Sequence, residues 1–257
     1  MKLDAKSTIE AGKAILGIEL GSTRIKAVLI DQENKPIAQG SHTWENQLVD
    51  GLWTYSVEAV WYGLQDCYAD LRTNVKSLYD TEIETLAAIG VSAMMHGYMA
   101  FNEKEEILVP FRTWRNTNTG QAAAALSELF VYNIPLRWSI SHLYQAILDN
   151  EEHVPSINYL TTLAGFVHWQ ITGQKVLGIG DASGMLPIDP ITKNYSSEWW
   201  ISSTNLLLRK DTTGSFEIFC RRYCRPVKTQ LPYSRRSQSP RRIGTSESRN
   251  SRLSARR

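Results

Sequence analysis

Residues 15–31 read ILGIELGSTRIKAVLID. A nearly continuous apolar run, 14–20, stops at the small residues of a tight turn, and a second apolar run, 24–31, follows. The first run predicts a strand that is covered on both faces. A further turn at 34–36 and a third stretch at 37–43 complete the pattern, which predicts a three-strand meander.

Helices and short strands are expected after the meander. Ser56 is placed to cap a helix that runs to about residue 79, with apolar or aromatic residues near helical spacing. A short buried strand is expected at 86–91, and two short segments, 99–101 and 107–109, flank a polar turn. The remaining predicted elements are helices at 119–130, 141–148 and 157–171, the last of which is capped by Ser156 and ended by Gly173. Because strands and helices are mixed, the fold class is α/β.

Charge divides the chain into two parts near Tyr195. Residues 196–257 hold 14 of the 28 basic and 4 of the 26 acidic residues, a net charge of +10, which leaves −8 for residues 1–195. The last 24 residues have almost no apolar content and no periodicity, so they bury too little surface to offset the entropy cost of ordering. We therefore expect an N-terminal extension at 1–13, a domain at 14–195, and a disordered basic tail at 196–257.

Composition excludes several classes of protein. No run of about 18 apolar residues is present to span a membrane, and the N-terminus lacks the apolar stretch of a secretory signal. Cys67, Cys220 and Cys224 form a sparse, odd set, which argues for a reducing compartment, and hence the cytoplasm, rather than a disulfide scaffold. The last two cysteines are four apart with no second pair nearby, a spacing that argues against a zinc site.

The first turn of the meander has the residues of an anion site. Gly21, Ser22 and Thr23 offer backbone N–H groups and two hydroxyls to an anion. Glu19, at the end of the incoming strand, could hold a hydrated Mg²⁺ ion beside that anion, and Lys26 could add a positive charge. A P-loop is excluded because neither a helix nor Gly-Lys-Ser/Thr follows the glycine. The alternative is an ordinary β-turn beside an exposed acid.

Three later stretches could line the same site. Residues 90–98, GVSAMMHGY, lead an apolar strand into His96 at the position where α/β folds place ligands; the alternative is a core or turn histidine. Residues 108–117, LVPFRTWRNT, offer an aromatic face for a sugar ring and polar groups for its hydroxyls; the alternative is a tryptophan that anchors the loop in the core. Residues 181–189, DASGMLPID, form a small-residue turn that either lines a site or is only a turn.

Taken together, these motifs resemble the FGGY family of carbohydrate kinases, most closely its xylulokinase branch. GIELGSTRIKA is similar to the family's phosphate hairpin, and SAMMHG to its S-G-Q-M-H-G segment. LVPFRTWRNT resembles the family's second sugar loop, and GDASGMLPID its S-D-A-S-G-T-L stretch. The matches follow the family's order over about residues 14–195. The resemblance implies a ribonuclease-H-like, actin-like ATPase domain, in which helices flank a mixed sheet.

The resemblance also implies ATP-dependent phosphorylation of a sugar, such as a pentulose, with Mg²⁺. The partners implied are the sugar and ATP. No association with a membrane is implied, and the resemblance leaves open whether the chain forms a homo-oligomer. The sequence departs from the family at two positions. The hairpin has Glu where the family usually has Asp. Arg-Asn follows Trp where the family commonly has an acid, so the identity of the sugar is left undetermined. The implied phosphate and magnesium positions are Glu19 (the metal ligand), Gly21, Ser22, Thr23 and Lys26, and the implied sugar positions are Met95, His96, Gly97, Trp114, Arg115 and Asn116.

Two parts of such a kinase are not found in the sequence. The family takes its general base from an Asp in a Gly-rich stretch, and most adenine contacts from a second domain. Neither follows residue 195, so the catalytic Asp is expected to be absent and the chain to be an inactive half of the enzyme.

Two hypotheses account for the tail. In the first, it is an out-of-frame translation, since degenerate codons for residues 210–220 permit a neighbouring frame that suits an α/β domain better. In the second, the chain is a non-catalytic interaction protein whose Arg- and Ser-rich tail binds RNA or another polyanion. The last 24 residues contain no aromatic residue, which favours the first hypothesis and confines any nucleic-acid role to the tail.

Overall fold

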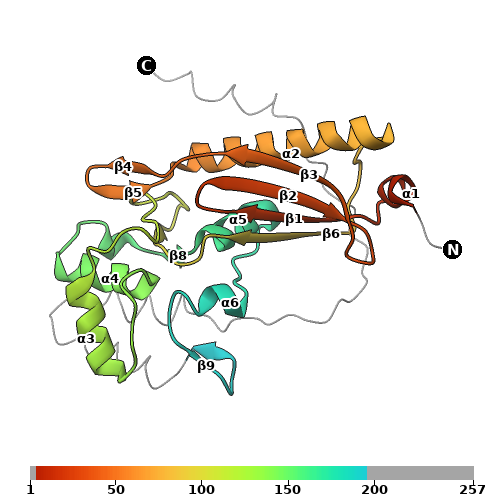
Figure 1. Cartoon of the computed structure of the whole chain (residues 1–257). Coiled ribbons are helices and arrows are strands. Elements are labelled where there is room, and N and C mark those ends of the chain that lie inside the picture. The colour runs from red at the N-terminus through yellow and green to blue at the C-terminus, as the bar shows by residue number, and fades with distance from the viewer. Residues whose placement is uncertain (1–3, 196–257) are drawn as a thin grey trace.

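The computed structural model describes residues 4–195, so the predicted disordered tail lies outside the described residues. A four-stranded sheet with the order β3-β2-β1-β6 forms its centre (Figure 1). The strands β1 (Ile15–Leu20), β2 (Arg24–Ile30) and β3 (Pro36–Thr43) form the predicted antiparallel meander, and β6 (Ala88–Ala93) pairs with β1 in parallel. The parallel pair matters for function because both strands end at the same edge.

The long helix α2 (Val57–Tyr79) runs along the sheet beside β3 (Figure 1). Its predicted cap is confirmed, because the Ser56 hydroxyl accepts a hydrogen bond from the Ala59 N–H at 3.0 Å. Gly40 of β3 allows the close approach. A Cβ there would lie 2.4 Å from the carbonyl oxygen of Cys67 and from the amide nitrogen of Leu71.

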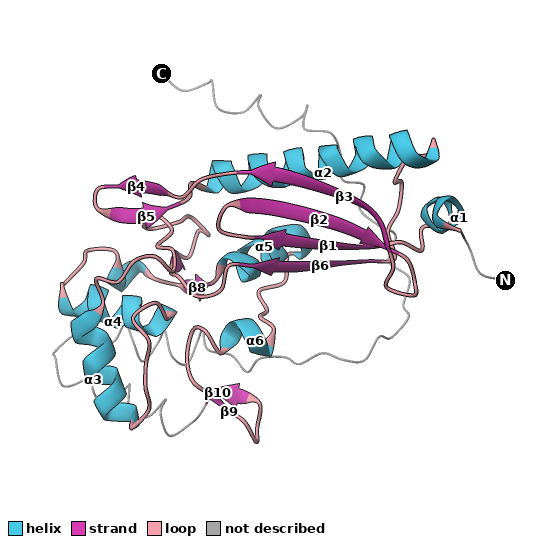
Figure 2. Ribbon diagram, in the orientation of Figure 1, coloured by secondary structure: helices cyan, strands magenta, loops and turns pink. Residues whose placement is uncertain are grey.

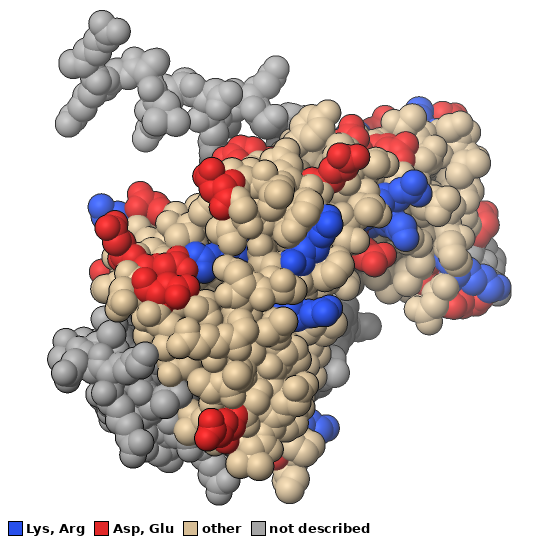
Figure 3. Space-filling model, turned by 60° about the vertical axis from the view of Figure 1, so that its left-hand side comes forward, with Lys and Arg blue, Asp and Glu red and all other residues tan. Residues whose placement is uncertain are grey.

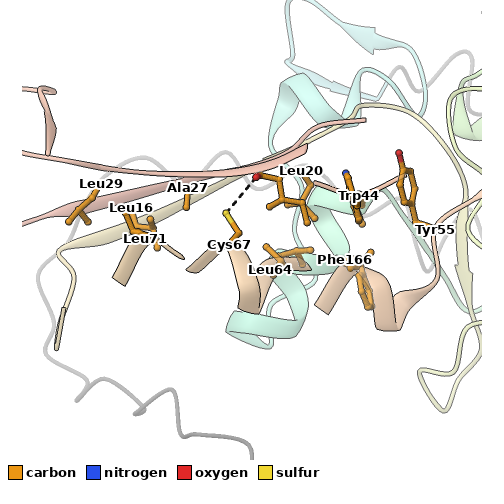
Figure 4. Packing of buried hydrophobic residues seen from close by; sticks show 14 of the residues in the cluster. Leu16, Leu20, Ala27, Leu29, Trp44, Tyr55, Leu64, Cys67, Leu71 and Phe166 are labelled. Atoms are coloured by element: carbon orange, nitrogen blue, oxygen red, sulfur yellow. Dashed lines mark hydrogen bonds between the residues drawn. The ribbon is translucent and has the colours of Figure 1, made fainter. Parts of the chain in front are cut away.

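One face of the sheet forms the main hydrophobic core. Leu16, Leu20 and Leu29 are at most 2% exposed and point toward α2, where Leu71 is fully buried (Figure 4). Helix α5 (Leu163–Thr172) contributes Phe166 to the same core. Burial of this alternating set is what specifies the register of the meander.

The opposite face differs from the prediction. Gly17 and Glu19 of β1 are exposed, as is Lys26 of β2, so the expectation that β1 is covered on both faces is wrong for the described residues. The expected buried strand is present as β6, but it is exposed, with Ile89 40% accessible. The reason is topological: β6 is the last strand of the sheet within residues 4–195, and its outer side has no neighbouring strand there.

A second hydrophobic cluster lies beside the sheet (Figure 2). It combines α3 (Gly120–Phe130) and α4 (Ser139–Leu148) with the small sheet of β7 (Met99–Phe101) and β8 (Tyr159–Thr161). These two helices match the predicted ones within two residues. A further hairpin, β4 (Gln47–Val49) and β5 (Leu52–Thr54), precedes α2.

The helix predicted from Ile157 begins later in the structure. Residues Val154–Ser156 form a 3-10 turn, β8 follows, and α5 starts at Leu163 with Thr162 rather than Ser156 as its cap. The Thr162 hydroxyl accepts from the Gly165 N–H at 3.2 Å. The predicted end at Gly173 is confirmed by its left-handed backbone, φ 73°.

Short elements complete the described chain. Helix α1 (Ala5–Glu10) lies in the predicted N-terminal extension, but its Ile9 is 1% exposed and belongs to the main core. Helix α6 (Ile179–Ala182) precedes the ladder of β9 (Ile188–Asp189) and β10 (Asn194–Tyr195). Within the described residues, no helix has the length and apolar character required to cross a bilayer. Acidic and basic side chains are interspersed on the face in Figure 3.

Candidate functional site

The β1–β2 turn is held by two aromatic side chains that bind its carbonyl groups. The Trp44 indole N–H donates to the Gly21 carbonyl at 2.8 Å, and the Trp44 backbone N–H donates to the Thr23 carbonyl at 3.2 Å. The Tyr55 hydroxyl donates to the Ser22 carbonyl. The two aromatic rings are stacked with centroids 4.2 Å apart. All three carbonyl oxygens of the turn are thus bound within the protein.

Two N–H groups of the same turn, those of Ser22 and Thr23, are left open. Within residues 4–195, neither the amides nor the hydroxyls of Ser22 and Thr23 have a hydrogen-bond partner. The turn is tight, because the Gly21 N–H donates to the Arg24 carbonyl at 3.0 Å and a Cβ on Gly21 would lie 2.9 Å from that oxygen. Neighbouring open amides with their carbonyls bound elsewhere are suited to an anion.

Glu19 and Lys26 face each other across β1 and β2 on the open face of the sheet. The Lys26 Nζ lies 3.9 Å from a Glu19 carboxylate oxygen, and both side chains are more than half exposed. Such a pair stabilises the fold by at most about 1 kcal/mol. No cluster of three or more metal-ligating side chains occurs in the described residues. A single accessible carboxylate still fits Mg²⁺, which usually keeps several waters and binds one or two carboxylates plus substrate phosphates.

Strand pairing brings the His96 segment next to the hairpin. Because β6 runs parallel to β1, the residues after both strands lie at one edge of the sheet. The Met94 N–H donates to the Leu20 carbonyl at 2.8 Å, which joins the residue before Gly21 to the residue two positions before His96. The predicted phosphate and sugar segments are therefore neighbours.

A sharp reversal of the chain sets the orientation of His96. His96 and Gly97 both have left-handed backbone conformations, with φ 70° and 88°. A Cβ on Gly97 would lie 2.7 Å from the Arg112 carbonyl oxygen, so a glycine is required there. The Gly97 N–H donates to the Arg137 carbonyl at 3.2 Å, and its carbonyl accepts from the Ser139 hydroxyl. The reversal is thereby attached to the start of α4.

The stretch at 181–184 packs against His96. The His96 Nδ1 lies 3.3 Å from the Gly184 carbonyl, and a Cβ on Gly184 would lie 2.7 Å from that nitrogen. Burial lowers the pKa of His96, which favours the neutral ring. Burial likewise raises the pKa of Asp181, whose carboxylate accepts a hydrogen bond from the Thr162 hydroxyl. The sequence had indicated this turn without a role for Asp181.

The Trp114 loop is linked to this reversal through Arg137, whose carbonyl accepts from the Gly97 N–H. Trp114 is half-buried, and the Arg137 guanidinium lies 5.8 Å from its ring centroid. Arg115 is exposed and stacks over Trp53 of β5 at 3.7 Å. Arg137 had no sequence signal, since only the fold brings residue 137 to the Trp114 ring. Among the predicted sugar positions, Met95 is 48% exposed beside His96.

Asn116 is engaged within the protein. It is 4% exposed, and its amide oxygen accepts from the Trp53 N–H at 2.9 Å. Its amide nitrogen donates to the carbonyls of Trp53 and Thr113, at 2.8 and 3.0 Å. These bonds anchor the Trp114 loop to β5, so the direct sugar contact remains a prediction for this residue.

Comparison with known proteins agrees with this geometry. The sequence profile described as the FGGY family of carbohydrate kinases, N-terminal domain, matches residues 14–202. The chain belongs to the FGGY family of carbohydrate kinases. It is 23% identical to the xylulose kinase of Bacillus subtilis over 194 residues, which cover 72% of this chain and 38% of that protein.

Solved structures of a xylulose kinase and a gluconate kinase share the fold. Xylulose kinase from Lactobacillus acidophilus aligns with a TM-score of 0.63 at 18% identity, over 76% of this chain and 40% of its own. Gluconate kinase from the same organism aligns with a TM-score of 0.61 at 18% identity, over 76% and 39% of the two chains. These likenesses confirm the predicted actin-like ATPase fold, with a mixed sheet flanked by helices. The chain spans about two-fifths of the length of these relatives.

Proposed function

We propose that this chain supplies the phosphate- and sugar-binding half of a kinase that transfers a phosphoryl group from ATP to a sugar hydroxyl, with a pentulose such as xylulose as the sugar. The observation that carries the proposal is the 2.8 Å bond between Met94 and Leu20. It places an open-amide hairpin beside a histidine turn at one edge of the sheet. Phosphoryl transfer depends mainly on such positioning and on charge neutralisation.

The hairpin receives the terminal phosphates of ATP in this proposal. The amides of Ser22 and Thr23 donate to phosphate oxygens, and Lys26 adds positive charge from the open face. Glu19 holds hydrated Mg²⁺ through its accessible carboxylate. The ion, when bound, neutralises charge on the transferring phosphate.

The sugar lies between the His96 reversal and the Trp114 loop. In a neutral His96 ring, which burial favours by lowering its pKa, Nδ1–H donates to the Gly184 carbonyl and Nε2 accepts a hydrogen bond from a sugar hydroxyl. The Trp114 ring offers an apolar face to the sugar. Because the chain covers about two-fifths of the length of its relatives, the proposal concerns substrate binding.

Calorimetry with D-xylulose tests the proposal. We expect the full chain to bind D-xylulose, and the variant His96→Asn to bind it at least about tenfold more weakly. Asn tolerates the left-handed backbone at this position, so the variant removes the imidazole with little added strain. His168→Asn, a change on helix α5 outside the residues assigned to the site, is the control and should keep the parent affinity. Absence of D-xylulose binding, or equal affinity in His96→Asn, contradicts the proposed sugar site.

A further inference from the structure

Four side chains form a closed polar ring behind the sugar segments. The Arg112 guanidinium binds both carboxylate oxygens of Glu151, one of them at 3.0 Å. His153 lies 3.4 Å from Glu151 through Nδ1 and 2.7 Å from the Tyr98 hydroxyl through Nε2. The Arg112 guanidinium lies 5.3 Å from the Tyr98 ring centroid, which completes the ring.

This ring joins the two predicted sugar segments at fixed positions. Tyr98 follows His96 by two residues, and Arg112 precedes Trp114 by two. Their backbones form a bridge, in which the Tyr98 N–H donates to the Arg112 carbonyl at 2.9 Å and the Arg112 N–H donates back at 3.1 Å. A displacement of Tyr98 would therefore move His96, and a displacement of Arg112 would move Trp114, because only one residue separates the members of each pair.

Burial makes the ring depend on one carboxylate. The Arg112 side chain is 6% exposed, and Glu151 is its ion-pair partner within residues 4–195. His142 lies on the same Tyr98 ring, with centroids 6.2 Å apart, and is fully buried. Neither nitrogen of His142 nor the Arg112 Nε has a hydrogen-bond partner in the described chain. Without Glu151, a buried cation would face an unbonded imidazole and an aromatic ring.

We propose that Glu151 and His153 are positioning residues of the sugar site. Glu151 fixes the Arg112 guanidinium, His153 fixes the Tyr98 hydroxyl, and together they set the distance between the His96 reversal and the Trp114 loop. The inference rests on the proposed function, because it assigns both segments to sugar binding. A purely structural ion pair would stabilise the fold without controlling the geometry at Trp114.

The variant Glu151→Gln tests the proposal with two measurements. It keeps the side-chain shape and removes the charge that pairs with Arg112. Calorimetry should show D-xylulose binding weakened by about tenfold or more, as displaced supporting groups typically cause. In protein labelled with 5-fluorotryptophan, the ¹⁹F resonance of Trp114, assigned with Trp114→Phe, should shift or broaden. This second readout reports the loop geometry without any sugar.

A destabilised control separates positioning from stability. Leu71→Ala opens a cavity in the main core, away from the ring, and should lower the melting temperature while leaving both the D-xylulose affinity and the Trp114 resonance unchanged. If Glu151→Gln fails to fold, Tyr98→Phe replaces it, because it removes one hydroxyl from the ring and keeps the aromatic packing. It should cause the same two changes to a smaller extent.

The outcomes distinguish this proposal from the proposed function. If the parent chain does not bind D-xylulose, the proposed function fails, and the Trp114 resonance alone decides whether the ring positions the loop. An unchanged resonance in a folded Glu151→Gln or Tyr98→Phe variant overturns the positioning role. Equal D-xylulose affinity in parent and variant overturns it as well.

Discussion

Gly97→Ala should destabilise the protein because the added Cβ both strains the backbone and collides with neighbouring atoms. Gly97 has φ 88°, a left-handed conformation that costs an L-residue about 1–2 kcal/mol. The added Cβ would also lie 2.7 Å from the Arg112 carbonyl oxygen and 2.8 Å from the Phe111 ring. Overpacking of this kind typically costs about 1–3 kcal/mol.

These contributions give a net magnitude that can be measured. Replacing glycine lowers the entropy of the unfolded chain, which offsets about 0.4–1 kcal/mol. The expected loss in the free energy of unfolding is therefore about 1–5 kcal/mol. For a domain of this size each kcal/mol lowers the melting temperature by about 2–4 °C, so a decrease of roughly 2–20 °C is expected.

Urea and thermal unfolding, followed by circular dichroism, measure this loss. Gly90→Ala is the matched control, because it lies in the neighbouring strand β6 and its Cβ would meet no atom within 4 Å. The control should stay within about 1 kcal/mol of the parent. Equal stability of Gly97→Ala and Gly90→Ala would refute the argument that the reversal requires glycine.

Three further changes have defined outcomes. Trp44→Phe removes the indole bond to the Gly21 carbonyl, so it should cost about 0.5–1.5 kcal/mol in urea unfolding and weaken Mg·ATP binding measured by calorimetry. Lys26→Met should change stability by less than about 1 kcal/mol, since its pair with Glu19 is exposed, yet it should also weaken Mg·ATP binding. Burial lowers the pKa of His142 from 6.5 to about 3, so the unfolded chain binds this proton at a higher pH than the folded one, and stability falls as pH decreases below about 6.5. His142→Leu should remove this contribution, about 2 kcal/mol between pH 6.5 and 5, and urea unfolding of both proteins at each pH measures the difference.

Local patterns in the sequence predicted the elements that carry the hairpin. The meander and α2 follow from apolar spacing, a tight turn and the Ser56 cap, all of which act within a few residues. The parallel pairing of β6 with β1 follows from no local pattern, and the family resemblance implied only a mixed sheet. This pairing is what brings His96 to the turn.

Long-range contacts account for what the sequence did not predict. The exposure of Gly17 on β1 depends on what covers the second face of the sheet, which an apolar run cannot specify. Asp181 is held at the site by its hydrogen bond with Thr162, and Arg137 reaches the Trp114 ring from the start of α4. The sequence distances between these partners match neither helical nor strand periodicity, so no local pattern predicts the contacts. Asn116 shows the converse: its polar groups suggested a ligand contact, which stays a prediction, and within the protein they bind the backbone of β5.

Residue-resolved NMR of the full chain tests the central claim most directly. Titration of ¹⁵N-labelled protein with Mg·ATP should shift the amide resonances of Ser22 and Thr23, and titration with D-xylulose should shift those of His96 and Gly97. Resolution by residue is essential, because residues 196–257 carry 14 basic side chains that also attract polyphosphates. Shifts confined to that basic segment with Mg·ATP, together with none at His96 or Gly97 with D-xylulose, would contradict the account of one shared substrate edge.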